Sequence, residues 1–124
     1  MTVLVLFGSS HVGARIIDRL TEVRGITVVE GRHQAAEAVQ LIAEMKPEIV
    51  VLDAQLGGGA GIEVLRKAKL LEWPPTVVMA ATSPYVQYHR ECMKEGADYF
   101  FHLPSEVEKL TTAISERVDR EVAE

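Results

Sequence analysis

One aspartate follows an apolar run at a place where α/β proteins carry functional groups. Asp53 closes the run 48–53, and the glycines 57–59 come shortly after it. Apolar runs of this length are typical of strands that are buried on both faces of a parallel sheet. In such sheets, ligands and reacting groups lie outside the carboxyl ends of the strands. This position makes Asp53 the first candidate for a functional side chain.

A second candidate is the loop from Gly8 to Gly13, which follows an apolar run and opens a helical pattern. Helix N-termini in such loops bind phosphate groups in many α/β proteins. The loop is no P-loop, because Ala14 and Arg15 stand where a lysine and a hydroxyl residue are needed. It also lacks the Gly-x-Gly start of a dinucleotide-binding loop. Nucleotide or other small-molecule binding stays open here, beside the simpler interpretation of a serine-capped helix start.

The other reactive residue types form no pattern of known chemistry. The chain has four histidines, and their spacing is not that of metal ligands: His11, His33, His89 and His102. His11 and His102 follow the first and fifth apolar runs, so these two could approach each other at the same edge of the sheet. No Gly-x-Ser-x-Gly motif is present. The single cysteine, Cys92, lies in a helical pattern and is expected to be buried and inert. We therefore expect neither a metal site nor an enzyme.

Five short apolar runs alternate with five helical patterns along the chain. The runs cover residues 3–7, 26–29, 48–53, 76–80 and 98–101, and helical spacing marks residues 12–23, 35–42, 62–68, 85–93 and 107–118. With right-handed crossovers, this alternation predicts one open parallel sheet with helices on both faces. The run 26–29 is short and flanked by charge, which indicates an edge strand. Ser105 and Glu108 have the spacing of a capping box that would start the last helix.

Composition narrows the classes of function. With 124 residues, of which 48% are hydrophobic, the chain is sized for a single soluble domain, residues 1–124. A net charge of −5 disfavours nucleic acid as a partner. No apolar run is long enough to span a bilayer, and the first residues lack the basic segment of a signal peptide. With one cysteine, a cytoplasmic location without membrane contact is the expectation.

The residues around Asp53 resemble the receiver domains of response regulators. The strand that ends in Asp53, the following residues 56–58 and the helix start at 61–65 are similar to the family's phosphoacceptor segment. Residues 95–101 are similar to the family's run into its fifth strand, so the resemblance covers nearly the whole chain. It implies an α/β fold of the flavodoxin/CheY-like type, with a five-stranded parallel sheet in the order 2-1-3-4-5. It also implies that Asp53 is the phosphoacceptor position and that Phe100 is the aromatic switch residue.

The residues that make a receiver's phosphoacceptor work are replaced in this chain. Receivers carry two acidic residues that hold Mg²⁺, a hydroxyl residue after the fourth strand and a lysine before a proline after the fifth. The corresponding positions hold Gly8 and Ser9, Ala81 with Thr82 following it, and Leu103 before Pro104. Phosphoryl transfer depends on positioning and on neutralising charge at the phosphoryl oxygens. We therefore expect weak or absent Mg²⁺ binding, and slow, weak or absent phosphorylation of Asp53.

Contact with other proteins is the function that the resemblance implies. Receivers bind partners or dimerise through the fourth helix, fifth strand and fifth helix, and this region holds Tyr85, Tyr88, Tyr99 and Phe100. Exposed aromatic side chains make good anchors at interfaces. The sequence predicts an atypical, stand-alone receiver in two-component or phosphorelay signalling, which binds a sensor histidine kinase or a downstream regulator and can form a homodimer through this region.

Three other interpretations stay open. Asp53 could be a conventional phosphoacceptor that receives its phosphate from a histidine kinase. The loop from Gly8 to Gly13 could make the chain a small-molecule or nucleotide-binding domain. The sequence is also compatible with a domain cut from a longer protein.

Overall fold

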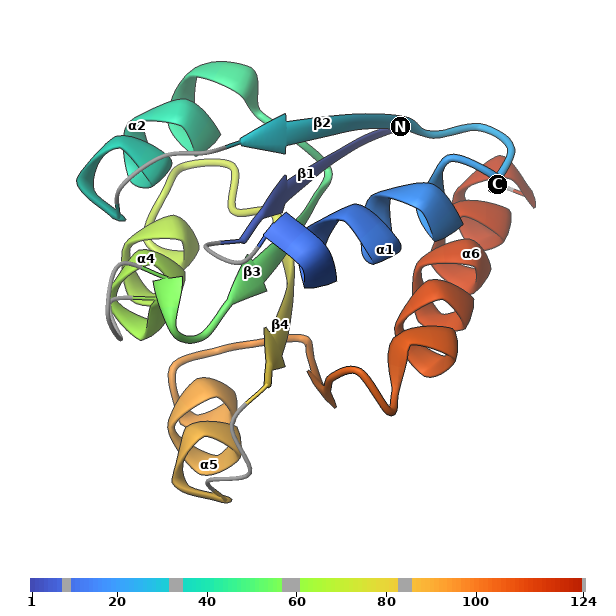
Figure 1. Ribbon diagram of the computed structural model, residues 1–124. Helices are drawn as coiled ribbons and strands as arrows, with labels where there is room; N and C mark the ends of the chain where they lie inside the picture. Colours follow the sequence, from blue (N-terminus) through green and yellow to red (C-terminus); the bar gives the residue numbers. More distant parts are fainter. Residues whose placement is uncertain (8–9, 32–34, 57–60, 83–85, 124) are drawn as a thin grey trace.

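The predicted strands form one parallel sheet in the computed structural model, which describes residues 1–7, 10–31, 35–56, 61–82 and 86–123. The strands are β1 (Thr2–Leu6), β2 (Thr27–Gly31), β3 (Ile49–Asp53), β4 (Thr76–Ala81) and β5 (Tyr99–His102). They lie in the order β2-β1-β3-β4-β5, and every neighbouring pair is parallel (Figure 1). The predicted α/β class, open sheet and strand order are confirmed, and β2 lies at an edge as its short run indicates.

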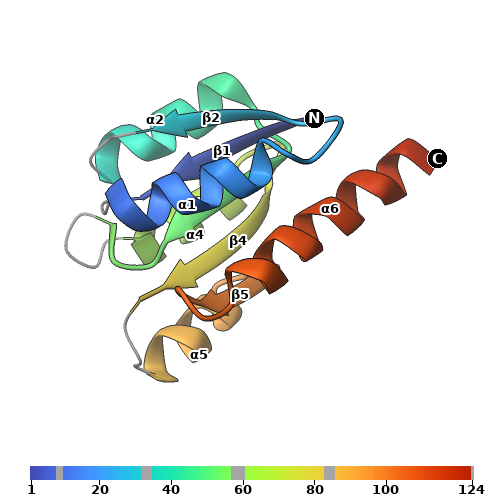
Figure 2. The ribbon, with the colours of Figure 1, turned by 45° about the vertical axis from the view of Figure 1, so that its right-hand side comes forward.

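Helices cover both faces of this sheet. α2 (Ala35–Met45), α4 (Gly61–Lys69) and α5 (Val86–Lys94) lie on one face, and α1 (Ser10–Leu20) and α6 (Val107–Ala123) lie on the other (Figure 2). Successive strand residues point to opposite faces, so each strand supplies both cores. In β1, for example, Leu4 packs under α2 and α4, while Val5 packs under α1 and α6. The double covering explains why the central strands are almost wholly apolar.

The central strand, β3, places Asp53 at the middle of the carboxyl end of the sheet. All five residues of β3 are buried, and the strand pairs with β1 on one side and β4 on the other. Asp53 is its last residue and lies opposite Ala80 of β4. The end of an apolar run, which the sequence marks, is thus also the spatial centre of the edge where α/β proteins carry their sites.

An ion pair fixes the segment between α4 and β4. Lys69 Nζ lies 2.6 Å from Asp98 Oδ2 and donates a second hydrogen bond, 3.0 Å long, to the carbonyl of Pro75. The same carboxylate oxygen accepts a hydrogen bond from the Val77 amide at 2.8 Å. Because Asp98 also binds the Val77 amide, these contacts join the start of β4 to the residue that precedes β5.

The last helix begins differently from the prediction. α6 starts at Val107, two residues after Ser105, and the capping box of Ser105 and Glu108 is wrong. Ser105 instead donates to the His102 carbonyl, and Glu108 pairs with Arg19 of α1. The carboxylate that satisfies a free amide at this turn is Glu106, which accepts a 2.7 Å hydrogen bond from the His102 amide. Glu106 thus ties the turn before α6 to the last residue of β5.

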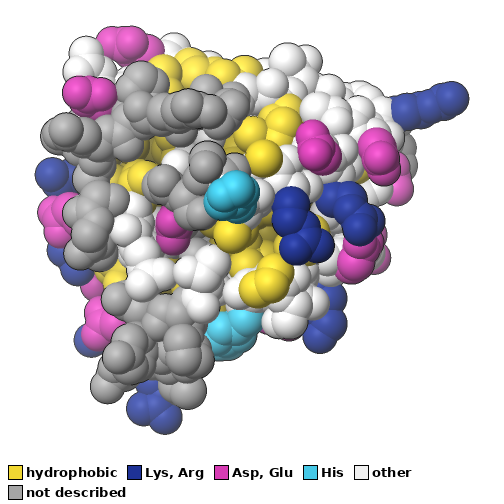
Figure 3. All heavy atoms as spheres, in the orientation of Figure 1, with side chains coloured by type: hydrophobic (Ala, Val, Ile, Leu, Met, Phe, Trp, Pro, Cys, Tyr) yellow, Lys and Arg dark blue, Asp and Glu magenta, His cyan; other side chains and the backbone are white. Residues whose placement is uncertain are grey.

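Charges of both signs are mixed on the surface. Figure 3 shows Lys and Arg side chains beside Asp and Glu side chains over α1 and α6, and Arg19 and Glu108 form their ion pair between these two helices. This alternation gives the described part of that face no continuous basic stripe of the kind that binds nucleic acid. Within the described residues, no helix combines the length and the apolar character that crossing a membrane requires.

Candidate functional site

Asp53 is the only polar or charged side chain that is buried among those that the structure describes. It is 8% exposed, and its Oδ1 atom accepts a 2.9 Å hydrogen bond from the Gln55 amide. This contact, two residues along the chain, is an Asx turn that carries the backbone away from the strand. The Asp53 carboxylate is thus positioned by the backbone and is still partly accessible to solvent. A reacting or ligand-binding group requires both.

The helix that follows is packed directly on this strand end. Gly61 opens α4, and a Cβ atom at Gly61 would lie 2.1 Å from the backbone oxygen of Asp53 and 2.7 Å from that of Ala54. Real Cβ atoms do not approach backbone oxygens so closely, so only glycine fits. The contact ties the first turn of α4 to Asp53 and fixes the backbone of the candidate site.

A hydroxyl group reaches the site from β4, but from one residue further than the resemblance implies. Ala81 is fully buried at the end of β4 and has no hydroxyl. Thr82, the next residue, is exposed and donates a 3.1 Å hydrogen bond from Oγ1 to Gln55 Oε1. The loops after β3 and β4 are therefore joined by side chains, and the Thr82 hydroxyl is occupied by Gln55.

Leu103 occupies the position where the resemblance implies a lysine, and its side chain is part of the core. It is 4% exposed and packs in the apolar cluster beneath α1 and α6, while its amide donates a 2.9 Å hydrogen bond to Ala81. Pro104 follows through a cis peptide bond and is exposed. The position where the resemblance implies a cation thus holds a hydrocarbon side chain that is buried in the core.

The described residues around Asp53 do not supply the ligand set of a magnesium centre. Mg²⁺ is held in proteins by carboxylates in octahedral oxygen geometry. No group of three or more His, Cys, Asp or Glu side chains comes together within the described ranges. The side-chain oxygen of Gln55, which could have served as a further ligand, is already engaged by Thr82. Gly8 and Ser9, which stand at the acidic positions, lie outside the described residues.

The second candidate, the loop from Gly8 to Gly13, is described only in part. α1 begins at Ser10, so the helix start that the sequence indicates is confirmed. His11 is exposed, and Gly13 lies against Phe7, where an added Cβ atom would be 3.2 Å from the phenylalanine Cβ. The described part of this loop therefore packs α1 on β1.

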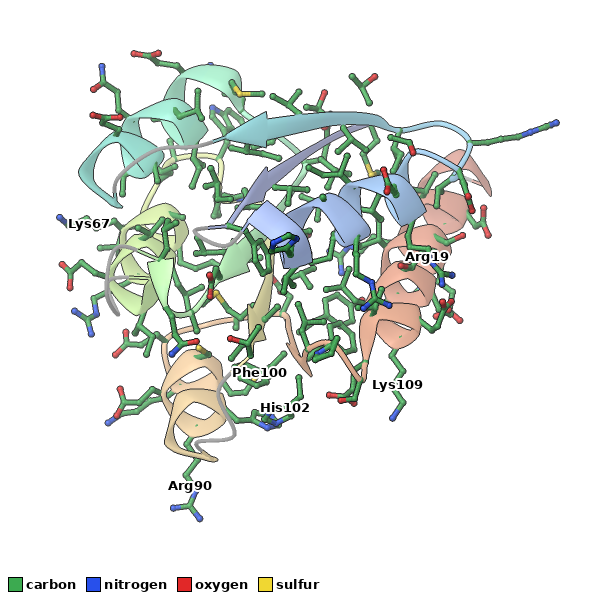
Figure 4. The ribbon with its side chains drawn as sticks, viewed as in Figure 1. Arg19, Lys67, Arg90, Phe100, His102 and Lys109 are labelled. Carbon is green, nitrogen blue, oxygen red and sulfur yellow. The ribbon has the colours of Figure 1, made fainter. Side chains whose placement is uncertain are left out.

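A cluster of three rings lies beside α5, and we call it the Phe100 cluster: His89, Phe100 and His102. His89 of α5 stacks on Phe100 with ring centroids 4.7 Å apart, and His102 meets Phe100 edge-on at 5.2 Å. Phe100 and His102 lie together in Figure 4. Phe100 is half-buried and packs on the core under α2, α4 and α5.

The other aromatic residues expected on this surface divide between the two faces of the sheet. Tyr99 stacks on Phe101 at 6.1 Å, and both pack on the core under α1 and α6, opposite Phe100. Phe100 and Phe101 thus lie on opposite faces of the sheet, as the alternation of side chains along a strand requires. Tyr85 and the side chain of Tyr88 lie outside what the structure describes. The sequence could have predicted that His102 lies beside Phe100, because residues two apart in a strand point to the same face. No pattern in the sequence indicates that His89 stacks on Phe100.

Cys92 takes no part in either site. It is fully buried under α5, as expected. Burial raises the pKa of the Cys92 thiol to about 11, and the negative charge of Glu91 adds to that effect. A thiol in this state is neutral at physiological pH and has little nucleophilic character.

Comparison with known proteins gives consistent results. A family model described as the response regulator receiver domain matches residues 9–115. A protein-glutamate methylesterase/protein-glutamine glutaminase of Bacillus subtilis is 30% identical over 104 residues, which are 83% of this chain and 29% of that protein. The sensory transduction protein LytT of Enterococcus faecalis is 28% identical over 99 residues, 80% of this chain and 40% of that protein. The chain thus spans less than half the length of these curated relatives.

Solved structures support the fold. The receiver domain of the putative response regulator NarL from Mycobacterium tuberculosis superposes with a TM-score of 0.83 at 19% identity, covering 95% of each chain. The response regulator domain of Thermotoga maritima CheB superposes with a TM-score of 0.78 at 21% identity, covering 97% of this chain and 94% of that one. At these identities the likeness concerns the fold alone.

Proposed function

Because the chain belongs to the response regulator receiver domains of two-component signalling, we propose that it acts mainly by binding other proteins, with weak or absent phosphorylation of Asp53. One observation carries this proposal: Leu103 is 4% exposed and packs in the core at the position of the family's lysine. A phosphoryl group on Asp53 would carry negative charge next to hydrocarbon on this side. Its stabilisation would rest on backbone amides such as that of Gln55.

The missing cation affects both the reaction and its product. In phosphoryl transfer, positive groups stabilise the transition state more than the ground state, and each such group accounts for a large share of the rate. Leu103 replaces the lysine, so one source of positive charge is missing. Gly8 and Ser9 replace the acidic pair, so the binding of Mg²⁺, the second source, is weakened. We propose accordingly that the chain has no catalytic activity of its own.

The surface of α5, β5 and α6 is the proposed contact region for a sensor histidine kinase or a downstream regulator. The Phe100 cluster lies there, with exposed His89 and half-buried Phe100 and His102. Rings that are already packed on one another lose little conformational freedom on binding, which favours them as anchors. The acidic net charge disfavours nucleic acid as the partner, and a cytoplasmic location away from membranes fits this role.

A second candidate is a slow but working phosphoacceptor, and one observation favours it. The Thr82 hydroxyl donates a hydrogen bond to the Gln55 side chain, and the backbone amide of Gln55 donates one to Asp53. These hydrogen bonds connect the end of β4 to the carboxylate. A histidine kinase could supply the phosphoryl group. The two candidates differ in what Asp53→Asn does, because only a phosphorylated chain needs this carboxylate for its output.

Capture of partners from the native cell by immobilised wild-type, Asp53→Asn and Phe100→Ala chains tests the proposal. Wild-type and Asp53→Asn are expected to retain the same proteins, and Phe100→Ala is expected to lose them. Circular dichroism checks that all three are folded. Loss of the captured proteins by Asp53→Asn, or their capture only after treatment with a phosphodonor, would favour the phosphoacceptor and overturn the proposal.

A further inference from the structure

An apolar surface lies between α2 and the segment that follows α4, and we call it the Trp73 surface: Ile42, Ala43, Lys46, Leu70, Leu71, Glu72 and Trp73. Trp73 is 70% exposed and Leu70 is 79% exposed, the highest values for large hydrophobic side chains among the described residues. A hollow of about 180 Å³ opens beside them. Figure 1 shows the segment after α4 passing close to α2 before it enters β4.

The size of this hollow indicates what could fill it. Pockets for drug-sized ligands measure roughly 300–1,000 Å³. The hollow is smaller than this range, and it is lined by Ile42 and Leu71 with Trp73 at its rim. It suits one inserted side chain from another protein better than a small molecule.

The backbone at Trp73 is restricted by the residues that follow it. Pro74 follows it, and a residue before proline is restricted to extended backbone. Pro75 is buried, and its carbonyl accepts the hydrogen bond from Lys69 that fixes the start of β4. An exposed tryptophan on a restricted backbone loses less conformational entropy when it is covered than one on a flexible segment, and tryptophan is among the residues that contribute most at protein interfaces.

Two unpaired charges of opposite sign border the hollow. Lys46 directly follows α2 and is exposed, and Glu72 precedes Trp73 and is also exposed. Neither side chain forms an ion pair with another residue in the described ranges. A patch with one cation and one carboxylate is complementary to itself under a twofold rotation, because each charge then meets its opposite on the other copy.

We propose that the Trp73 surface is an interface between two copies of this chain, related by a twofold axis. Trp73 and Leu70 of one protomer cover the hollow of the other. Lys46 faces Glu72 of the partner subunit, and this contact occurs twice in each dimer. The surface lies where the strands begin, at the end of the sheet opposite Asp53, so dimerisation leaves Asp53 and the Phe100 cluster free for other proteins.

Trp73 provides a direct readout because it is the only tryptophan in the chain. As protein concentration rises, its fluorescence is expected to shift to shorter wavelength while sedimentation reports a mass rising from 13.7 kDa towards twice that value. Trp73→Ala is expected to weaken the dimer by about 30-fold or more, measured by sedimentation.

Charge reversal then tests the arrangement. Lys46→Glu and Glu72→Lys alone are each expected to weaken self-association about 10-fold, since each places like charges together twice. An equimolar mixture of the two variants restores association, because every contact is again between opposite charges, and the double variant does so by itself. Arg90→Glu, a reversal on α5 far from the hollow (Figure 4), serves as the control and is expected to leave association unchanged.

Two results would overturn the proposal. One is a monomer at all concentrations with an unshifted tryptophan spectrum, as expected if a different protein covers the surface. The other is a dimer that resists Lys46→Glu and Glu72→Lys but is weakened by Arg90→Glu, which would place the contact on the face of α5. Both results leave the proposal for Asp53 unaffected, because the partner capture with Asp53→Asn does not depend on the Trp73 surface.

Discussion

The ring of His89 lies flat on the ring of Phe100, with centroids 4.7 Å apart and planes within 7° of parallel. The two residues come from α5 and β5, so this stack is a direct contact between the helix and the strand of the proposed binding face. His102 meets the edge of the same phenylalanine. Changes at any of these rings should therefore alter both the stability of α5 on the sheet and the shape of the face.

Removing the stack should destabilise the protein by a modest and specific amount. His89→Ala is expected to cost about 0.5–1.5 kcal/mol of unfolding free energy, the usual contribution of an aromatic pair. Urea denaturation measures it. Arg90→Ala, at the neighbouring exposed position, is the matched control and should change the free energy by less than about 0.5 kcal/mol. Equal effects of the two substitutions would show that the stack contributes nothing.

Gly61 should tolerate no side chain. Gly61→Ala places a Cβ atom 2.1 Å from the Asp53 carbonyl oxygen, so the helix start must move, at an expected cost of about 3 kcal/mol or more. Gly25→Ala is the control, because Gly25 has a positive φ of 87° but its nearest neighbouring atom is 3.4 Å from the added Cβ. Backbone strain alone should cost this variant about 1 kcal/mol. Thermal or urea unfolding of both variants separates the steric clash at Gly61 from the backbone strain at Gly25. Similar decreases in unfolding free energy for the two variants would contradict the close packing of Gly61 on Asp53.

Much of the fold follows from the sequence, because its cause is a repeating pattern. Each strand is buried on both faces and is therefore an apolar run, and Asp53 stands out as the residue that ends the central one. Phe100 and Phe101 lie on opposite faces because side chains alternate along a strand. These features depend on spacing along the chain, which a single sequence displays.

The rest depends on which groups meet in space. The start of α6 could not be predicted, because Glu106 caps the His102 amide in a turn whose geometry is tertiary. The stack of His89 depends on how α5 is rotated on the sheet, and the neighbouring residues of α5 do not fix that rotation. The hollow beside Trp73 forms between segments about thirty residues apart, so no local pattern indicates it.

Lowering the pH should remove the part of the unfolding free energy that the ionised Glu106 carboxylate contributes. The hydrogen bond from the His102 amide holds the pKa of Glu106 below its usual value, with a smaller contribution from Lys109. Because the folded-state pKa lies below the unfolded one, this contribution is present above the unfolded value near 4.5 and is lost as the pH falls through the folded one.

Glu106→Gln should therefore be less stable than wild type at pH 7 and should approach it at low pH. Urea titrations of both proteins from pH 7 down to the acid limit of folding measure the difference. A gap that persists unchanged at the lowest pH would contradict the role of the ionised carboxylate.

Restoring the missing groups should restore phosphorylation. A variant that combines Gly8→Asp, Ser9→Asp and Leu103→Lys is expected to react with a small phosphodonor in the presence of Mg²⁺ at least about 10-fold faster than wild type, since transition-state charge is again neutralised. The same variant with Asp53→Asn is the control for modification elsewhere. No gain in a folded variant would mean that other features of the site limit the reaction.

The central claim is tested most directly by intact mass measurement of the wild-type chain after incubation with Mg²⁺ and a small phosphodonor, beside Asp53→Asn. The account predicts that the wild-type mass stays unchanged, or gains a phosphoryl group slowly and in only a small fraction of molecules, because the buried Leu103 supplies no cation at the position of the family's lysine. Rapid and complete gain of one phosphoryl group by wild type, absent from Asp53→Asn, would contradict it.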